Sequence, residues 1–392
     1  KGVLKMRRFS VYGRRFALLA ILSILCLLGV TSVALGDTLY CVSIAPDGGQ
    51  ADNGTNSVRV SADGNFAAFM SYASNLVPGD TNGWTDIFVR NLATGETELV
   101  SIASDGTQAN YPSSRQSISA EGRFVAFASA ASNLVPDDTN GVTDVFVRDR
   151  LLGTTERVSV ATDGTQANAS SFEPAISANG LFVTFESYAT NLVPDDTNGR
   201  AEVFVHDRVT GITQRASVAS DGVQANHLSR YQSISAEGRY VAFASYASNL
   251  VMNDTNGTWD IFVRDLLEGT TERVSIASDG TQSDNWSYPA HISADGRFVA
   301  FVSWATNLVA DDTNWVWDIF VHDRVTHTTE RVSIASDGAQ PLSHSQDPYI
   351  SGDGRYVVFT CSWPLAPEVS DRQLNIYPVS YTHLRAHETK AN

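Results

Sequence analysis

The chain has 392 residues, enough for one large domain or two to three of ordinary size. A hydrophobic content of 43% with only 18% charged residues supports a packed core and argues against a disordered chain. The formal net charge is −16, from 27 basic and 43 acidic residues. So acidic a protein repels nucleic acid and anionic lipid and suits cations or basic partners. We therefore exclude a nucleic-acid-binding protein.

The first 36 residues are typical of a secretory signal. Residues 1–15 hold six basic residues and no acid, an apolar run follows from Phe16 to Val30, and the small residues Ala34 and Gly36 come next. A retained membrane anchor is the alternative, because the apolar stretch approaches spanning length. We expect residues 1–36 to be a signal peptide, with a secreted or periplasmic product that is not stably inserted in a membrane.

A repeat of 58 residues then runs through the chain without insertions. Six turn-forming dipeptides mark it: Asp63-Gly64, Glu121-Gly122, Asn179-Gly180, Glu237-Gly238, Asp295-Gly296 and Asp353-Gly354. A second series keeps the same spacing: Asp47-Gly48, Asp105-Gly106, Asp163-Gly164, Asp221-Gly222, Asp279-Gly280 and Asp337-Gly338. Repetition at this period is the signature of an architecture built from stacked or radially arranged units.

One unit predicts four strands, called A to D: Gln116–Ser119, Arg123–Ser129, Thr143–Asp149 and Thr155–Ala161. The A–B turn carries Glu121-Gly122, and its Asn-Gly and Asp-Gly equivalents favour a type I′ hairpin. Strands B and C are apolar on both faces, as in a sheet that is covered on both sides. Six such units predict an all-β, six-bladed β-propeller of four-stranded antiparallel blades over residues 37–377. A β-solenoid is the alternative, but its parallel coils lack tight hairpins.

The recurring sequence Ser-Ala-Asp-Gly-Arg-Phe-Val-Ala-Phe, as at residues 293–301, resembles the WD-like repeat of TolB-type β-propellers. The resemblance covers about residues 38–377. It implies the fold and little about activity, because propellers host enzymes, scaffolds and receptors alike.

The ends of the repeat predict how the ring closes. Thr38–Ile44 aligns with strand D, so we expect it to pair with a strand near Asn375–Tyr377 in the sixth blade. Cys41 and Cys361 would then lie two strands apart, about 9.6 Å, beyond the roughly 7 Å between Cα atoms that a disulfide allows. We predict two free thiols. The repeat stops after Tyr377, and we interpret residues 378–392 as a non-native tail.

The long B–C and D–A connections are predicted to share one face of the ring, and the B–C connection repeats an acidic cluster. Its members are Asp80, Asn82 and Asp86; Asp138, Asn140 and Asp144; Asp196, Asn198 and Glu202; Asp254, Asn256 and Asp260; and Asp312, Asn314 and Asp318. Side-chain oxygens at this spacing suit a hard cation such as calcium. The alternative is a structural Asx-turn, in which Asp and Asn bond their own backbone.

The sequence shows no catalytic constellation. It contains neither Gly-x-Ser-x-Gly nor His-Glu-x-x-His. His206 and His322, at the end of strand C, are expected to be satisfied or exposed surface residues. Arg59, His291 and Tyr349 share one phase of strand A, where we expect them to line the central channel without chemistry.

We therefore expect an exported, monomeric binding or scaffold propeller that uses an acidic long-connection face for an unidentified protein or glycan. Calcium is the one cofactor the sequence suggests. The alternative is an extracellular enzyme acting on polysaccharide through the central channel. Glycan hydrolysis requires two carboxylates, and we expect none at the strand A positions.

Overall fold

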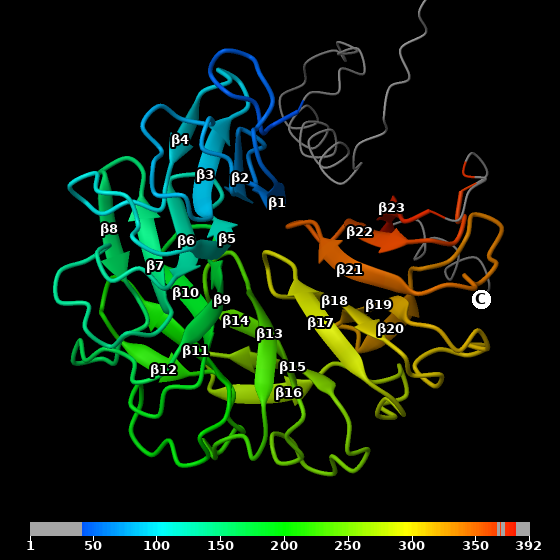
Figure 1. Ribbon diagram of the computed structural model, residues 1–392. Coiled ribbons are helices and arrows are strands. Elements are labelled where there is room, and N and C mark those ends of the chain that lie inside the picture. Colours follow the sequence, from blue (N-terminus) through cyan, green and yellow to red (C-terminus); the bar gives the residue numbers. More distant parts are fainter. Residues whose placement is uncertain (1–40, 367–368, 370–372, 382–392) are drawn as a thin grey trace, which may run out of the picture.

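The computed structural model describes residues 41–366, 369 and 373–381, which form 23 strands in six sheets arranged in a ring (Figure 1). The A strands are β1 (Thr55–Val60), β5 (Ser113–Ile118), β9 (Ser171–Ile176), β13 (Ser229–Ile234), β17 (Ser287–Ile292) and β21 (Ser345–Ile350). The B strands are β2 (Phe66–Ser71), β6 (Phe124–Ser129), β10 (Phe182–Ser187), β14 (Tyr240–Ser245), β18 (Phe298–Ser303) and β22 (Tyr356–Cys361). The C strands are β3 (Asp86–Asn91), β7 (Asp144–Asp149), β11 (Glu202–Asp207), β15 (Asp260–Asp265), β19 (Asp318–Asp323) and β23 (Asn375–Ser380). The D strands are β4 (Thr97–Leu99), β8 (Thr154–Arg157), β12 (Thr213–Arg215), β16 (Thr270–Arg273) and β20 (Thr328–Arg331).

The chain is a six-bladed β-propeller, as predicted. Each blade pairs its strands in the order A, B, C, D with antiparallel neighbours, and the sixth has three described strands. Strand A begins earlier than predicted and contains a bulge in every blade, such as the one between Ser114 and Ser117. The bulge places one residue in the left-handed region in five blades: Ser57, Arg115, Glu173, Tyr231 and Asp347. This extra residue shifts which side chains face the channel.

The A–B turn differs from the predicted type I′ hairpin. Gly122 has φ +72°, whereas Glu121 is not in the left-handed region. The Gly122 amide donates to the Ser119 carbonyl at 3.0 Å. A type I turn followed by a left-handed glycine accounts for this geometry, since type I′ requires positive φ at both central residues.

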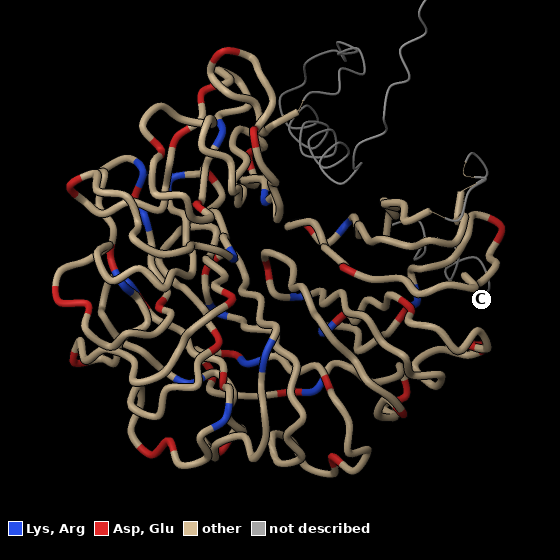
Figure 2. Tube along the Cα trace, in the orientation of Figure 1, with Lys and Arg blue, Asp and Glu red and all other residues tan. Residues whose placement is uncertain are grey.

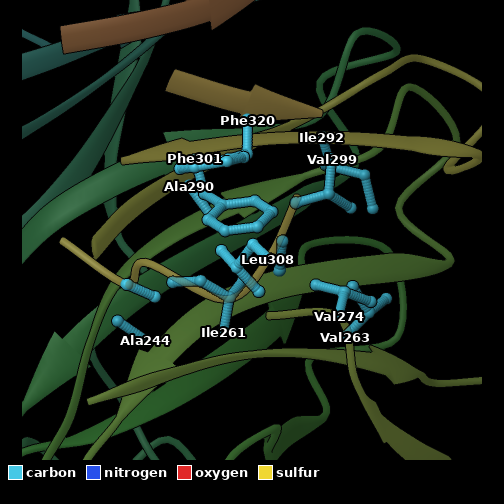
Figure 3. Packing of buried hydrophobic residues seen from close by; sticks show 12 residues of the cluster. Ala244, Ile261, Val263, Val274, Ala290, Ile292, Val299, Phe301, Leu308 and Phe320 are labelled. Atoms are coloured by element: carbon cyan, nitrogen blue, oxygen red, sulfur yellow. The ribbon is translucent and has the colours of Figure 1, made fainter. Parts of the chain in front are cut away.

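The hydrophobic core lies between neighbouring blades, because both faces of each sheet are apolar. Between the fourth and fifth blades, Ile261 and Val263 of β15 pack with Val299 and Phe301 of β18 and with Phe320 of β19 (Figure 3). All five are at most 1% exposed. Each blade is therefore held by its neighbours, as the covered sheets predicted.

Glycines of the A–B turns allow blades to approach closely. A Cβ at Gly180 would lie 2.1 Å from Cδ2 of Phe124 in the preceding blade. The same ring lies under Arg208, whose Cζ is 4.3 Å from the ring centroid and whose Nε is 2.5 Å from Oε1 of Glu156. The face with short turns is therefore used for contacts between blades.

The junction between the first and sixth blades differs from the others. Phe69, Ala73, Leu76 and Phe88 form a small cluster with no member from the sixth blade among the described residues. Within the described part of the chain, β23 pairs only with β22. Residues 38–40 lie outside the described residues, and Ile44 forms its bridge with Gln50. The described end of the predicted closing strand therefore does not supply the fourth strand, because it folds into a D–A type turn.

The sixth blade extends beyond the predicted boundary at Tyr377. Strand β23 continues through Pro378, which pairs with Val358. Pro378 is tolerated because β23 is an edge strand in the described structure and its outer side needs no amide donor. Tyr381 is 1% exposed and packs edge-on against Phe298, with ring centroids 5.6 Å apart. Residues 378–381 thus belong to the fold, and the rest of the predicted tail lies outside the described residues.

The predicted free thiols are confirmed. Cys41 is exposed, Cys361 is buried at the end of β22, and neither forms a disulfide. Among the described residues, no helix is long and apolar enough to cross a membrane.

Candidate functional site

The B–C and D–A connections contact each other on one side of the ring, here called the long-connection face. The Asn82 amide of a B–C connection donates to the Ala109 carbonyl of the following D–A connection at 3.1 Å. The Asn110 amide of that connection donates to Oδ1 of Asn133, in the next B–C connection, at 3.0 Å. Hydrogen bonds therefore join these connections from blade to blade. Figure 2 shows acidic residues at the tips of connections around the rim.

The structure brings the predicted Asp–Asn clusters together. In each, the Asn amide donates to the carboxylate four residues later at 2.7–2.9 Å: Asn82 to Asp86, Asn140 to Asp144, Asn198 to Glu202, Asn256 to Asp260 and Asn314 to Asp318. In the second blade Ser159 also donates to Oδ1 of Asp144 at 2.5 Å. These buried carboxylates thus have several partners within the protein.

An arginine from strand D, missed in the sequence analysis, completes four of the five clusters. Nη1 of Arg157 lies 3.0 Å from Oδ1 of Asp138 and 3.6 Å from Oδ2 of Asp144. Arg215, Arg273 and Arg331 occupy the same place in the third to fifth blades. The first blade has Leu99 there. The arginine that recurs at the end of strand D in four repeats was the sequence signal that could have revealed this contact.

Burial dominates the titration of these acids. It raises the pKa of Asp138 and Asp144, and Arg157 acts in the opposite direction. Burial also raises the pKa of Asp86 to about 6, and there Asp80 adds to the rise. Within the described residues no group of three or more His, Cys, Asp or Glu has a metal-binding arrangement.

The Asx-turn geometry occurs in both long connections. Oδ1 of Asn82 accepts from the Trp84 amide at 2.9 Å. Oδ1 of Asp105 accepts from the Thr107 amide at 2.9 Å, and these hydrogen bonds lower the pKa of Asp105. Unlike the buried cluster acids, Asp105 is exposed at the tip of its connection.

The two strand C histidines are satisfied within the fold, as expected. Nδ1 of His206 and of His322 lies 2.8 Å from a threonine hydroxyl, that of Thr213 and of Thr329 respectively. Arg148 bonds the equivalent Thr155 hydroxyl at 3.1 Å. Burial lowers the pKa of His206, and lowers that of His322 to about 4 with a contribution from His327.

The three predicted channel residues meet at the junction of the ring. The rings of His291 and Tyr349 lie 4.1 Å apart, and Arg59 lies over Tyr349 with its Cζ 5.0 Å from the ring centroid. Burial, with a smaller effect of Arg59, lowers the pKa of His291 to about 3. Arg59 therefore links the first blade to the sixth.

Two strand A carboxylates were missed in the sequence analysis. Glu173 and Asp347 lie on the left-handed bulge residues of β9 and β21. Both act electrostatically on Tyr349, and Nε of Arg115 is 3.2 Å from Oε1 of Glu173. The expectation that strand A supplies no carboxylates near the channel is therefore wrong. The bulge interrupts the alternation of side chains along strand A, so an alternating pattern does not locate these two carboxylates.

Exposed aromatic side chains also gather on the long-connection face. Ten aromatic side chains are strongly exposed among the described residues, and nine of them lie in these connections or in the first half of strand A: Tyr72, Trp84, Tyr111, Tyr188, Tyr231, Tyr246, Trp286, Trp304 and Trp315. The tenth, Tyr356, begins β22. Because contiguous exposed apolar surface is typical of interaction sites, this face is the candidate binding surface.

Two of these side chains, Tyr231 and Tyr246, join four further rings in a continuous series, here called the aromatic row: Tyr246, Trp259, Tyr231, Tyr288, Trp317 and His344. Successive centroids from Tyr246 through Trp259, Tyr288 and Trp317 to His344 are 6.0, 6.4, 6.0 and 5.0 Å apart. Tyr231 stacks on Tyr288 at 5.8 Å. The row crosses the fourth, fifth and sixth blades.

Comparison with known proteins supports the fold. No family model and no curated protein sequence matches the chain. Among solved structures it is similar to the β-propeller domain of the Trilobed protease from Pyrococcus furiosus, which has an open Velcro topology (13% identity, 84% of this chain and 82% of that one, TM-score 0.50). It is also similar to oligogalacturonate lyase from Vibrio parahaemolyticus (12% identity, 85% and 78%, TM-score 0.50).

TolB from Acinetobacter baumannii is a further structural neighbour (15% identity, TM-score 0.44). The match covers 76% of this chain and 57% of the TolB chain. The propeller fold that the predicted resemblance implied is confirmed by the six sheets of the ring and by the similarity to the Pyrococcus propeller domain. The two neighbours with a TM-score of 0.50 are a lyase and a propeller domain of a protease, so the fold alone does not select an activity.

Proposed function

We propose that this protein is an exported binding propeller that holds its ligand on the long-connection face. The observation that carries the proposal is the gathering of nine exposed aromatic side chains on that side of the ring. On the opposite face, which carries the short turns, polar side chains form contacts between blades, such as the ion pair of Arg208 with Glu156. The exposed aspartates at the D–A tips add a negative field that attracts cations and basic groups.

A glycan and peptide array probed with the mature chain tests the proposal. The test variant W304A/W315A removes two exposed rings of one B–C connection, where Nε1 of Trp304 donates to the Trp315 carbonyl. The control L151A/V209A removes two side chains that are 74% and 72% exposed on C–D turns of the opposite face. We expect the captured ligand to be lost in the first variant and retained in the second. The reverse pattern, or no captured ligand, would reject the proposal.

The channel carboxylates favour a second candidate, an enzyme acting on polysaccharide. Glu173 and Asp347 both act on Tyr349, which contacts His291 and Arg59. A pair of carboxylates is what glycoside hydrolysis uses. Release of reducing ends from a polysaccharide by the wild type, lost in both E173Q and D347N, would establish catalysis. Release that survives both substitutions would exclude these residues.

A further inference from the structure

The aromatic row is not required to build the blades. The Ser287 amide donates to the Trp259 carbonyl at 2.9 Å, and the Ser345 amide donates to the Trp317 carbonyl at 2.8 Å. In the first three blades the equivalent serine amide donates, at 2.8–2.9 Å, to the carbonyl of a residue with a small side chain: Thr85, Thr143 and Ala201. Since small side chains suffice there, the fold does not explain two tryptophans at this position.

The rings remain accessible although they rest on the core. Tyr231 is 42% and Tyr246 37% exposed. Trp259 and Tyr288 pack partly against the core between the fourth and fifth blades, and Trp317 packs against the next one. The core therefore holds the row in place while one side of it faces solvent. A ligand would meet rings that are already ordered, so binding would cost little side-chain entropy.

The chemistry of the row limits its ligand. The ring contacts within the row join aromatic groups only, and the polar atoms of these groups are tyrosine hydroxyls, indole N–H groups and the nitrogens of a histidine ring. A ligand that matches this surface has flat apolar faces and hydroxyl groups around them. Nucleobases offer flat faces as well, but a chain of net charge −16 repels the phosphate backbone that carries them.

We propose that the aromatic row is a binding site for an uncharged glycan, whose sugar rings stack on Trp259, Tyr288 and Trp317. This inference rests on the proposed binding function and names the ligand class for one part of the long-connection face. The centroids of Trp259 and Tyr288 lie 6.4 Å apart and those of Tyr288 and Trp317 lie 6.0 Å apart, with ring planes inclined at 53° and 68°. The three rings therefore do not form one flat platform, and a bent sugar chain would contact them one after another. Arg230 and Glu186, paired at 3.1 Å near Tyr188, flank the row with hydrogen-bonding groups.

Affinity electrophoresis through gels that contain neutral polysaccharides (xyloglucan, glucomannan, mixed-linkage β-glucan or mannan) tests this proposal. Polygalacturonate and heparin gels serve as polyanion arms. We expect at least one neutral polysaccharide to retard the wild type, and neither polyanion to do so. The variant W259T/W317T introduces the residue that the first two blades carry, so it is compatible with the blade structure. Its apparent affinity should fall about tenfold or more, which corresponds to at least about 1.4 kcal/mol of binding free energy.

Leu267 and Val325 supply the matched control. They are 72% and 67% exposed on the C–D turns of the fourth and fifth blades, on the face opposite the aromatic row. We expect L267A/V325A to keep full retardation. Y231A removes an exposed member of the row and should weaken binding without a loss of thermal stability, which separates binding from folding.

The outcomes distinguish this inference from the proposed function. Absence of retardation in every neutral gel, or equal retardation of wild type and W259T/W317T, overturns the glycan site. Retardation by polyanions alone overturns it as well. If the array instead yields a peptide whose capture is lost in W304A/W315A, the binding face stands and only the glycan assignment fails.

Discussion

The first blade and the second blade build the same acidic cluster with one difference. Both place an Asn amide 2.7 Å from a buried Asp, and both close the cluster with a serine hydroxyl. The second blade adds Arg157, and the first has Leu99 at the equivalent position. Since a cluster forms in either case, the Asn and Ser hydrogen bonds are sufficient for its geometry. The arginine therefore acts on charge, offsetting carboxylates that burial makes costly.

The substitution R157L makes the second blade resemble the first and should have the largest effect. It leaves Asp138 and Asp144 buried without their cation, and breaking a buried ion pair costs about 3–5 kcal/mol. We expect a loss of that size in the free energy of unfolding, measured with urea at pH 7.5. The control R123L breaks the pair with Asp149 at 2.7 Å, where Arg123 is 40% exposed. It should cost about 1 kcal/mol or less, and equal losses in the two variants would contradict the comparison.

The converse substitution L99R should stabilise the protein. It places a guanidinium beside Asp80 and Asp86, whose pKa values are raised by burial with no arginine to oppose the rise. Lowering one pKa by a unit corresponds to about 1.4 kcal/mol, so we expect a gain of about 1 kcal/mol at pH 7.5. The control L99M keeps an apolar side chain and should change little. If L99R lowers the free energy of unfolding more than L99M does, the first blade cannot accept the ion pair.

The gain from L99R should depend on pH. Burial raises the pKa of Asp86 in the folded wild type to about 6, from an ordinary value of 3.8. A raised folded pKa stabilises the protein fully below the unfolded pKa, and this contribution is lost as pH rises through the folded value. An added arginine favours the charged carboxylate, so the difference between L99R and wild type should be full above about pH 6 and shrink toward pH 4. Urea unfolding of both proteins across this range measures it. A constant difference would exclude Asp86 as its source.

Features that recur in every blade could be predicted from the sequence. Features that depend on a strand bulge or on contacts between particular blades could not. The blade order followed from the 58-residue period and the apolar B and C strands. The Asn140–Asp144 contact is local, so spacing predicted it. Glu173 was missed because a bulge changes the phase of strand A, and an alternating pattern does not reveal a bulge. The aromatic row was missed because Trp259 and Tyr288 meet across two blades at different repeat positions, where only the packed ring brings them together.

The same comparison restricts the calcium hypothesis to the first blade. The expected stabilisation by calcium is the smallest of the predicted effects. In the second to fifth blades an arginine already occupies the place beside the carboxylates that a cation would need. Asp80, Asn82 and Asp86 of the first blade have no such arginine. We therefore expect millimolar calcium to stabilise the wild type through the first blade alone. A ligand that binds only the folded state stabilises it by about 0.4 kcal/mol when its concentration equals Kd.

Thermal unfolding with and without calcium measures this effect. The shift in Tm should vanish in L99R, because the guanidinium takes the place of the cation. It should persist in D138A/N140A/D144A, which alters only a cluster that contains an arginine. A shift that survives L99R and disappears in the triple variant would place calcium in the arginine-bearing blades. No shift in the wild type at millimolar calcium would leave the five clusters with a purely structural role, in which Asn and Ser fix the long connections and arginine balances the buried charge.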